Sequence, residues 1–170
     1  MLSRRPQAII DLAALEHNFA RVKQLAPNSK VLAVLKANAY GHGMLAVAQA
    51  LKQADALGVA RLDEALALRA GGIARPIVLL EGFFHADELA QIVASNLQLV
   101  IHHRDQAEAL LAATLDAPVR VWLKIDTGMH RLGIYPHEFN ELYQRLSQSA
   151  NVQGPLRLMS HFASSDELDK

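Results

Sequence analysis

The chain has 170 residues, and its 17 lysines and arginines are balanced by 17 aspartates and glutamates, so the formal net charge is zero. This balance provides no electrostatic footprint for nucleic acid or for an anionic membrane surface. Hydrophobic residues make up 51% of the chain and charged residues 20%, which is typical of a globular protein and excludes intrinsic disorder. Cysteine is absent, which excludes disulfides, thiolate nucleophiles and cysteine-ligated metals.

In chain order, the first predicted element is a helix over 12–25, with Asp11 as its N-cap residue. Short aliphatic runs then alternate with helical patterns, as expected for an α/β protein. The runs predict strands at 31–35, 56–60, 76–80, 97–101, 119–125 and 156–159. Such short, continuous apolar runs are typical of strands that are buried on both faces of a parallel sheet. The segments between the runs predict helices at 44–54, 63–70, 87–95, 106–114 and 136–147.

Six consecutive β/α units favour a (β/α)8 TIM-type barrel over an open doubly wound sheet, because such a run is long for half of a doubly wound fold. A leucine-rich solenoid is the third possibility, but its L-x-x-L-x-L-x-x-N repeat does not recur in the sequence. A complete barrel needs eight strands and about 250 residues. The sequence therefore predicts one α/β domain that contains about the first six β/α units of a barrel.

No apolar run approaches the roughly 20 residues that are needed to cross a bilayer. The absence of cysteine is consistent with a reducing compartment. We therefore expect a soluble, cytoplasmic protein without a membrane or nucleic-acid partner.

Polar side chains follow each predicted strand; they are Lys36, Arg61, Glu81, His102, His103, Lys124, Asp126 and His161. In both barrels and doubly wound sheets, ligands bind at the carboxyl ends of the strands. These residues are therefore candidates for a functional site. The alternative is that the strands simply end where polar sequence begins.

The segment VLKANAYGHG, residues 34–43, places Lys36 at the end of a buried run and before a glycine-containing turn. Burial of a lysine lowers the pKa of its ammonium group and makes a nucleophilic amine suited to Schiff-base chemistry. The glycines allow backbone N–H groups to approach an anion near the start of the next helix. The alternative is a lysine that extends from the strand end into water.

The segment KIDTGMHRLG, residues 124–133, places Lys124, Asp126 and Arg131 around a second turn. Arg131 is suited to binding a carboxylate or a phenolate with two hydrogen bonds. The alternative is a solvated loop with a surface pair between Asp126 and Arg131. His161, after the last predicted strand, is a third candidate, and a purely structural histidine is the alternative there.

These segments carry a resemblance to a known family. VLKANAYGHG resembles the pyridoxal-phosphate attachment motif of alanine racemases, and KIDTGMHRLG and SHFASSDE resemble the family's next two signatures, in the same order. The resemblance extends from Gln7 to Glu167. It implies that residues 1–170 form an incomplete N-terminal barrel domain of this family and that the C-terminal β domain is absent. It also implies an isomerase that acts as a homodimer on alanine and supplies D-alanine for peptidoglycan.

The resemblance also implies roles for individual residues. Lys36 would hold pyridoxal 5'-phosphate as an internal aldimine and act as one of two catalytic bases. Tyr40 would bind the cofactor phosphate, and Arg131 would bind the phenolic oxygen of the cofactor and the carboxylate of the substrate. Lys124 matches a lysine that is carbamylated in several members, and His161 matches a histidine next to the cofactor. The second base is a tyrosine of the partner subunit, so the chain alone is expected to be inactive.

Four other functions are alternatives. Non-catalytic pyridoxal-phosphate-binding barrel proteins and decarboxylases of the same barrel type both lack a segment like DTGMHRLG. Its presence in this chain therefore favours a racemase over either of them. A racemase with broader amino-acid specificity remains an alternative. A metalloenzyme is not expected, because the eight histidines include no H-E-x-x-H motif and a strand would point His102 and His103 to opposite faces.

Overall fold

A computed structural model describes residues 7–167, so both ends of the predicted 1–170 domain lie outside the described residues. After the opening helix α1 (Leu12–Leu25), strands and helices alternate along the chain. The strands are β1 (Leu32–Val34), β2 (Ala56–Val59), β3 (Ile77–Leu79), β4 (Gln98–Ile101), β5 (Arg120–Lys124) and β6 (Arg157–Met159). The helices are α2 (Lys36–Tyr40), α3 (Met44–Ala50), α4 (Leu62–Ala70), α5 (Glu88–Ala94), α6 (Arg104–Ala112), the 3-10 helix η1 (Pro136–Glu138) and α7 (Phe139–Ser147). Each predicted strand is confirmed.

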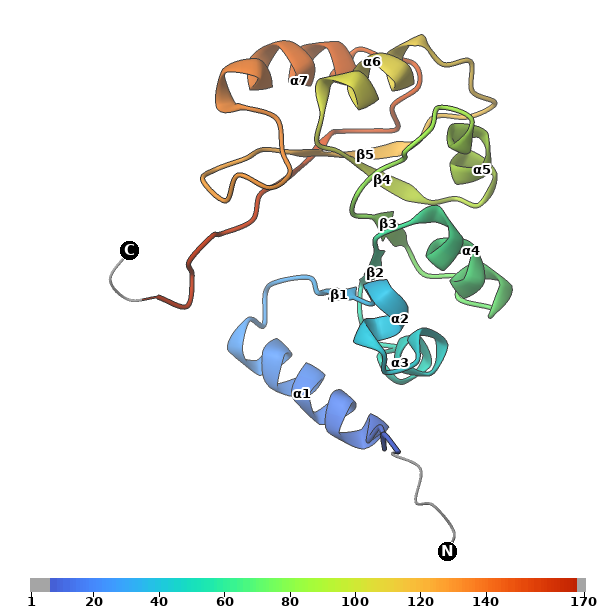
Figure 1. The fold of residues 1–170 in the computed structure, drawn as a ribbon, viewed down its shortest axis with the longest axis vertical. Helices are drawn as coiled ribbons and strands as arrows, with labels where there is room; N and C mark the ends of the chain where they lie inside the picture. Colours follow the sequence, from blue (N-terminus) through green and yellow to red (C-terminus); the bar gives the residue numbers. More distant parts are fainter. Residues whose placement is uncertain (1–6, 168–170) are drawn as a thin grey trace, which may run out of the picture.

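Within residues 7–167, the strands form one six-stranded sheet in the order β1-β2-β3-β4-β5-β6, and each neighbouring pair is parallel. The strand order follows the chain order, without the reversal that defines a doubly wound sheet. The sheet curves, and helices α3 to α7 lie along its outer side (Figure 1). The structure is thus a half-barrel of six β/α units, which confirms the predicted barrel fold.

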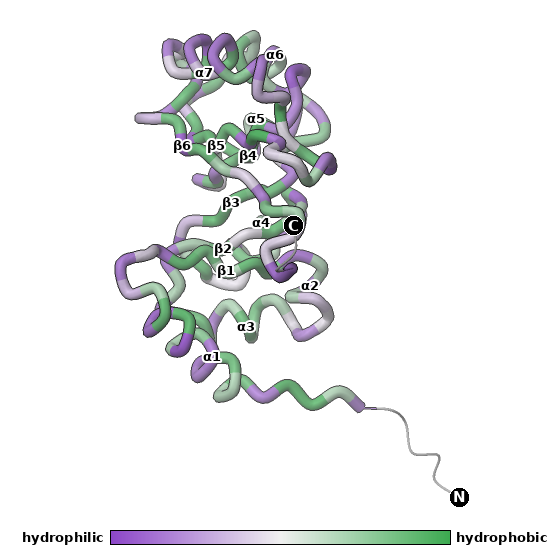
Figure 2. The backbone as a smooth tube through the Cα atoms, turned by 90° about the vertical axis from the view of Figure 1, so that its left-hand side faces the viewer, coloured by the Kyte–Doolittle hydropathy of each residue, from purple (hydrophilic) through white to green (hydrophobic). Residues whose placement is uncertain are grey.

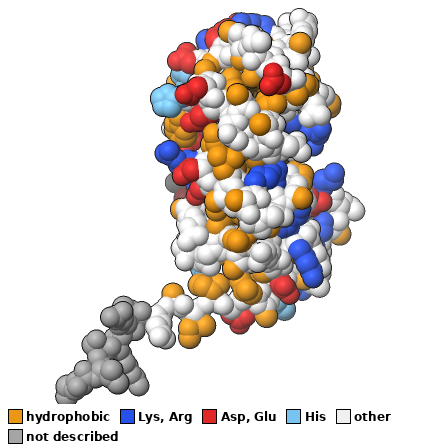
Figure 3. All heavy atoms as spheres, turned by 90° about the vertical axis from the view of Figure 1, so that its right-hand side faces the viewer, with side chains coloured by type: hydrophobic (Ala, Val, Ile, Leu, Met, Phe, Trp, Pro, Cys, Tyr) orange, Lys and Arg blue, Asp and Glu red, His pale blue; other side chains and the backbone are white. Residues whose placement is uncertain are grey.

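The main core lies between the sheet and the outer helices. Strand side chains alternate between the two faces of a sheet, so Ile77 and Leu79 pack against the helices whereas Val78 points to the inner face. The strands form the apolar centre of the chain, and polar positions concentrate in the helices and loops (Figure 2). On the helix-covered face, lysines, arginines and acidic residues are interspersed with apolar side chains (Figure 3). No helix of the described part is long and apolar enough to cross a membrane.

Several helix boundaries differ from the prediction for local reasons. Helix α1 has the predicted bounds, and the Asp11 side chain accepts a hydrogen bond from the Ala14 N–H at 3.1 Å. Helix α6 begins two residues early, because the His103 side chain accepts a hydrogen bond from the Asp105 N–H and caps it. The predicted helix at 136–147 is divided into the 3-10 turn η1 and helix α7.

Candidate functional site

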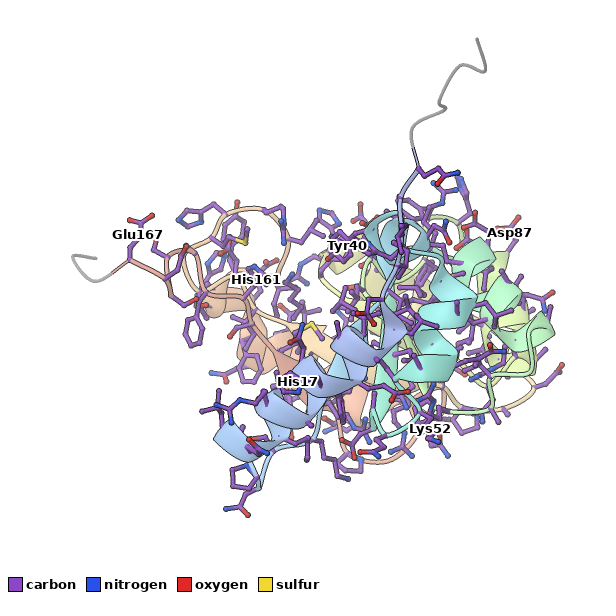
Figure 4. All side chains as sticks on the ribbon, turned by 90° about the horizontal axis from the view of Figure 1, so that it is seen from below. His17, Tyr40, Lys52, Asp87, His161 and Glu167 are labelled. Atoms are coloured by element: carbon purple, nitrogen blue, oxygen red, sulfur yellow. The ribbon has the colours of Figure 1, made fainter. Side chains whose placement is uncertain are left out.

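The predicted site residues lie at one edge of the sheet. Because the six strands are parallel, their carboxyl ends share that edge. Lys36 follows β1, Lys124 ends β5, Arg131 lies in the loop after β5, and His161 follows β6. In the view of Figure 4, Tyr40 and His161 lie toward the same side of the molecule, and Lys52, beyond the end of helix α3, lies toward the opposite side.

The turn after Lys36 has an unusual backbone. Residues 37–40 all have φ between 52° and 53°, so they form a turn of left-handed helix. The left-handed conformation costs roughly 1–2 kcal/mol per non-glycine residue, and the chain compensates with hydrogen bonds. Asn38 supplies two of them: its side chain accepts from the Met44 N–H at 2.8 Å, and its carbonyl accepts from the Gly43 N–H at 3.0 Å. The turn therefore holds Lys36 and Tyr40 in a defined arrangement.

Glu64 in helix α4 also fixes this turn, and sequence analysis did not identify it. Its Oε1 accepts a hydrogen bond from the Ala37 N–H at 2.6 Å, and its Oε2 accepts from the N–H groups of Ala60 and Arg61 at 2.9 and 3.3 Å. One carboxylate therefore joins the residue after Lys36 to the end of β2. A sequence signal was present, since Glu64 is the third residue of helix α4, where glutamate commonly caps backbone N–H groups.

The loop that carries Arg131 is closed at its base and filled by Asp126. The Asp126 N–H donates to the Ile134 carbonyl at 3.0 Å, and the Ile134 N–H donates to the Lys124 carbonyl at 2.9 Å. The Asp126 carboxylate accepts from the N–H groups of Gly128 and His130 at 3.0 Å each and contacts His130 Nδ1 at 3.0 Å. The side-chain partner of Asp126 is thus His130, and the surface pair between Asp126 and Arg131 is not formed.

Asp126 is held in its ionised form by this loop. The backbone N–H groups of His130 and Gly128, in that order, stabilise the carboxylate and lower the pKa of Asp126 from 3.8 to about 2. Gly133 closes the loop at φ 141°, where a Cβ atom would lie 2.4 Å from the Asp126 nitrogen. The loop conformation next to Arg131 therefore depends on an ionised aspartate and on a glycine.

Lys124 is the buried charged residue of the described part, with 7% of its surface exposed. Burial lowers the pKa of its ammonium group, and the positive charges of Arg131 and Lys36 lower it further, whereas Asp126 opposes them. Lys124 is therefore within electrostatic reach of both Arg131 and Lys36. A lowered pKa favours the neutral amine, which is the form of lysine that acts as a nucleophile.

The remaining candidates are more open. Tyr40 is 60% exposed, and Arg131 and His161 are also exposed. A cavity of about 450 Å³ lies beside the loop, between Arg131 and His102. His102 Nε2 donates a hydrogen bond to the Glu81 carbonyl at 3.1 Å, and burial lowers the pKa of His102. His103 also lines this cavity, but its side chain contacts Asp105, and the Arg61 side chain contacts Asp63.

The arrangement suits a negatively charged ligand. Lys36, Lys124 and Arg131 lie at the carboxyl ends of the strands, and the carboxylate of Asp126 is already bonded within its own loop. The donors comprise a primary amine, a guanidinium and, at Tyr40, a phenol. Within residues 7–167, no group of three histidine, aspartate or glutamate side chains is placed to hold a metal ion.

Comparisons of the sequence and of the structure with known proteins identify the same family. The family described as "Alanine racemase, N-terminal domain" matches residues 10–170. The "Alanine racemase, biosynthetic" of Escherichia coli O6:H1 is 57% identical over 159 residues, which cover 94% of this chain and 44% of that protein. An "Alanine racemase" of Yersinia pestis is 55% identical over 160 residues, covering 94% and 45%. The crystal structure of the biosynthetic alanine racemase of Pseudomonas aeruginosa matches with a TM-score of 0.90 and 47% identity, over 95% of this chain and 45% of that one. The chain spans about half the length of the curated relatives it matches.

Proposed function

We propose, because the chain belongs to the family of alanine racemase N-terminal domains, that it is the cofactor-binding part of an enzyme that interconverts L-alanine and D-alanine. The observation that carries this proposal is the cluster of Lys36, Lys124 and Arg131 at the carboxyl edge of the half-barrel. A site of this kind supports acid–base chemistry on an anionic substrate.

The donor set fits pyridoxal 5'-phosphate, which contains an aldehyde, a phenolate and a phosphate. Lys36 would hold the aldehyde carbon, Arg131 the phenolate oxygen and the substrate carboxylate, and Tyr40 the phosphate. His161, at the neighbouring strand end, would contact the bound cofactor. When bound, the cofactor supplies an electron sink for the charge that remains on the substrate Cα after its proton is removed.

Racemisation needs a proton to leave one face of Cα and another to arrive at the opposite face. The Lys36 amine, held by the left-handed turn, takes and returns the proton on one face. The second base is a tyrosine from a partner subunit of a homodimer. Carbamylation of Lys124 would convert its cation into an anion, which would orient the Arg131 guanidinium and remove the repulsion between the two residues.

The same proposal includes the physiological setting. The enzyme would act in the cytoplasm and supply D-alanine for peptidoglycan. Residues 1–170 would be the incomplete N-terminal barrel domain, and the β domain of the full-length enzyme would follow it. The coverage of about 45% of each relative supports this division of the longer protein.

Borohydride trapping tests the assignment of Lys36. After incubation with pyridoxal phosphate and reduction, we expect peptide mapping to find a stable adduct on the peptide that contains Lys36. Lys36→Ala removes this adduct, and Lys52→Ala, in the turn after helix α3, retains it. An adduct on Lys124, or on no peptide, would contradict the assignment.

An activity assay tests the second base. In an assay coupled to D-amino-acid oxidase, the purified 170-residue chain should show no racemisation, because loss of one general base lowers the rate by about 10²–10⁴-fold. Turnover comparable to that of a full-length racemase would show that both bases lie within this chain.

A further inference from the structure

Two arginines lie on the inner face of the half-barrel, at the end opposite to the proposed site. Arg120 begins β5 and Arg157 begins β6. Trp122 pairs in register with Arg157 and lies two residues after Arg120, so the three side chains project from the same face. They line a cavity of about 550 Å³ at the amino ends of the strands.

Gln98 and Trp122 hold Arg157 in place. The Gln98 side-chain oxygen accepts hydrogen bonds from Arg157 Nη1 at 3.1 Å and from the indole N–H of Trp122 at 2.9 Å. The Arg157 guanidinium carbon lies 4.9 Å from the centre of the Trp122 ring. Arg120 is the register partner of Gln98 on the adjacent strand. Arg120 is therefore a diagonal neighbour of Arg157 on the inner face, and both residues line the cavity.

These two positive charges have no counter-ion in the described part of the chain. No carboxylate of residues 7–167 forms an ion pair with either arginine. Burial lowers the pKa of Arg157, and the charge of Arg120 lowers it further. The one carboxylate among the described residues that line the cavity is Asp55, which already accepts a hydrogen bond from the Val31 N–H at 2.8 Å. Lys30 adds another positive charge at the rim.

A closed barrel makes this arrangement costly. The interior of a (β/α)8 barrel is filled with packed side chains, and an unpaired charge in such an interior is destabilising. A carboxylate is the complementary group, because its two oxygens match the planar geometry of a guanidinium. Strands β1 and β6 are the edges of the sheet, so a segment that completes the barrel would cover this face.

We propose that Arg120 and Arg157 form a carboxylate-binding site, and that its occupant is an aspartate or glutamate side chain from the polypeptide that closes the half-barrel. The matched relatives have sufficient chain for such a segment, since the match covers about 45% of each. The site is independent of the proposed racemase function, because it lies at the other end of the strands and uses none of the same residues.

Fluorescence of Trp122, the one tryptophan of the sequence, reports on the site. Acetate, a free analogue of an acidic side chain, should change the emission of the 170-residue chain saturably, and sodium chloride at matched ionic strength should not. Arg120→Gln should weaken acetate binding at least tenfold, and Arg21→Gln on helix α1 should leave it unchanged. Equal responses to acetate and chloride, or an unchanged affinity in Arg120→Gln, would overturn the site.

A fusion protein tests which group occupies the site between Arg120 and Arg157. Residues 1–170 are fused to the part of the Pseudomonas aeruginosa racemase that follows its matched region, and Tm is measured in buffer without carboxylates. If a side-chain carboxylate pairs with the arginines, Arg120→Met lowers Tm, because a buried negative charge loses its partner. An unchanged or raised Tm would overturn the proposed occupant, since removal of an unpaired buried charge is stabilising.

Discussion

Asp126 shows how one side chain sets the shape of a functional loop. It is 9% exposed at its side chain and interacts with two backbone N–H groups and a histidine ring. Arg131 follows His130 directly, so the position of the arginine depends on this arrangement. The charge of Asp126 is therefore linked to the geometry that the proposed function needs.

The Asp126→Asn variant tests this link through pH. The pKa of Asp126 is about 2 in the folded chain and is ordinarily 3.8, so the carboxylate stabilises the fold at pH values above 3.8. This stabilisation is lost as pH falls through 3.8 toward 2, because the unfolded chain then binds the proton more readily. In urea unfolding, wild type should exceed Asp126→Asn in midpoint above pH 4, and the difference should close near pH 2. A difference that does not change with pH would show that the charge contributes nothing.

Glu64 acts on a larger scale, since it joins helix α4, the end of β2 and the turn after Lys36. Three backbone N–H groups donate to its carboxylate. The left-handed conformation is unfavourable for the non-glycine residues of this turn. The Glu64 carboxylate, which lies outside the turn, helps to stabilise it by accepting a hydrogen bond from the Ala37 N–H. The elements beside the proposed site are thus coupled through one side chain.

The Glu64→Ala variant should loosen this turn. Loss of hydrogen bonds to a charged acceptor is expected to lower the free energy of unfolding by about 1–3 kcal/mol. Hydrogen exchange at the Ala37 amide should accelerate more than exchange at Leu57 in the sheet core. The matched control is Glu16→Ala on the exposed face of helix α1, which should change neither quantity. Unchanged protection at Ala37 would exclude the coupling.

Across the whole molecule, the half-barrel leaves two sheet edges, β1 and β6. Unpaired edge strands present backbone N–H and carbonyl groups to other chains. Leu158 in β6 is 52% exposed, which adds an apolar side chain to one edge. The described part therefore has a packed core, but the backbone groups at both edges of its sheet are unpaired.

We expect the chain to self-associate through these edges. Sedimentation velocity should show association that increases with protein concentration, and Leu158→Lys should weaken it, because a lysine on an edge strand opposes pairing. Lys52→Ala, in a turn outside both edge strands, is the control and should behave as wild type. A strictly monomeric wild-type chain at high concentration would contradict the expectation.

The sequence alone was sufficient for the alternation of strands and helices, the parallel sheet and the barrel class. A continuous apolar run such as 76–80 has apolar side chains on both faces of the strand, so both faces must be covered. This requirement can be read from a short stretch of sequence. The position of Lys36, Lys124 and Arg131 at one edge also followed from the order of the strands, and their roles in catalysis stay predictions.

Only the tertiary structure determined which side chains bond to one another. Glu64 and Ala37 are 27 residues apart in the chain, and no sequence period connects them. The pairing of Asp126 with His130 depended on a positive φ at His130, which periodicity does not reveal. Arg120 and Arg157 come from different strands, and their proximity on the inner face depends on the register between β5 and β6. Hydrophobic patterning determines which face of an element is buried, whereas hydrogen bonds and charges depend on distances that exist only after the chain has folded.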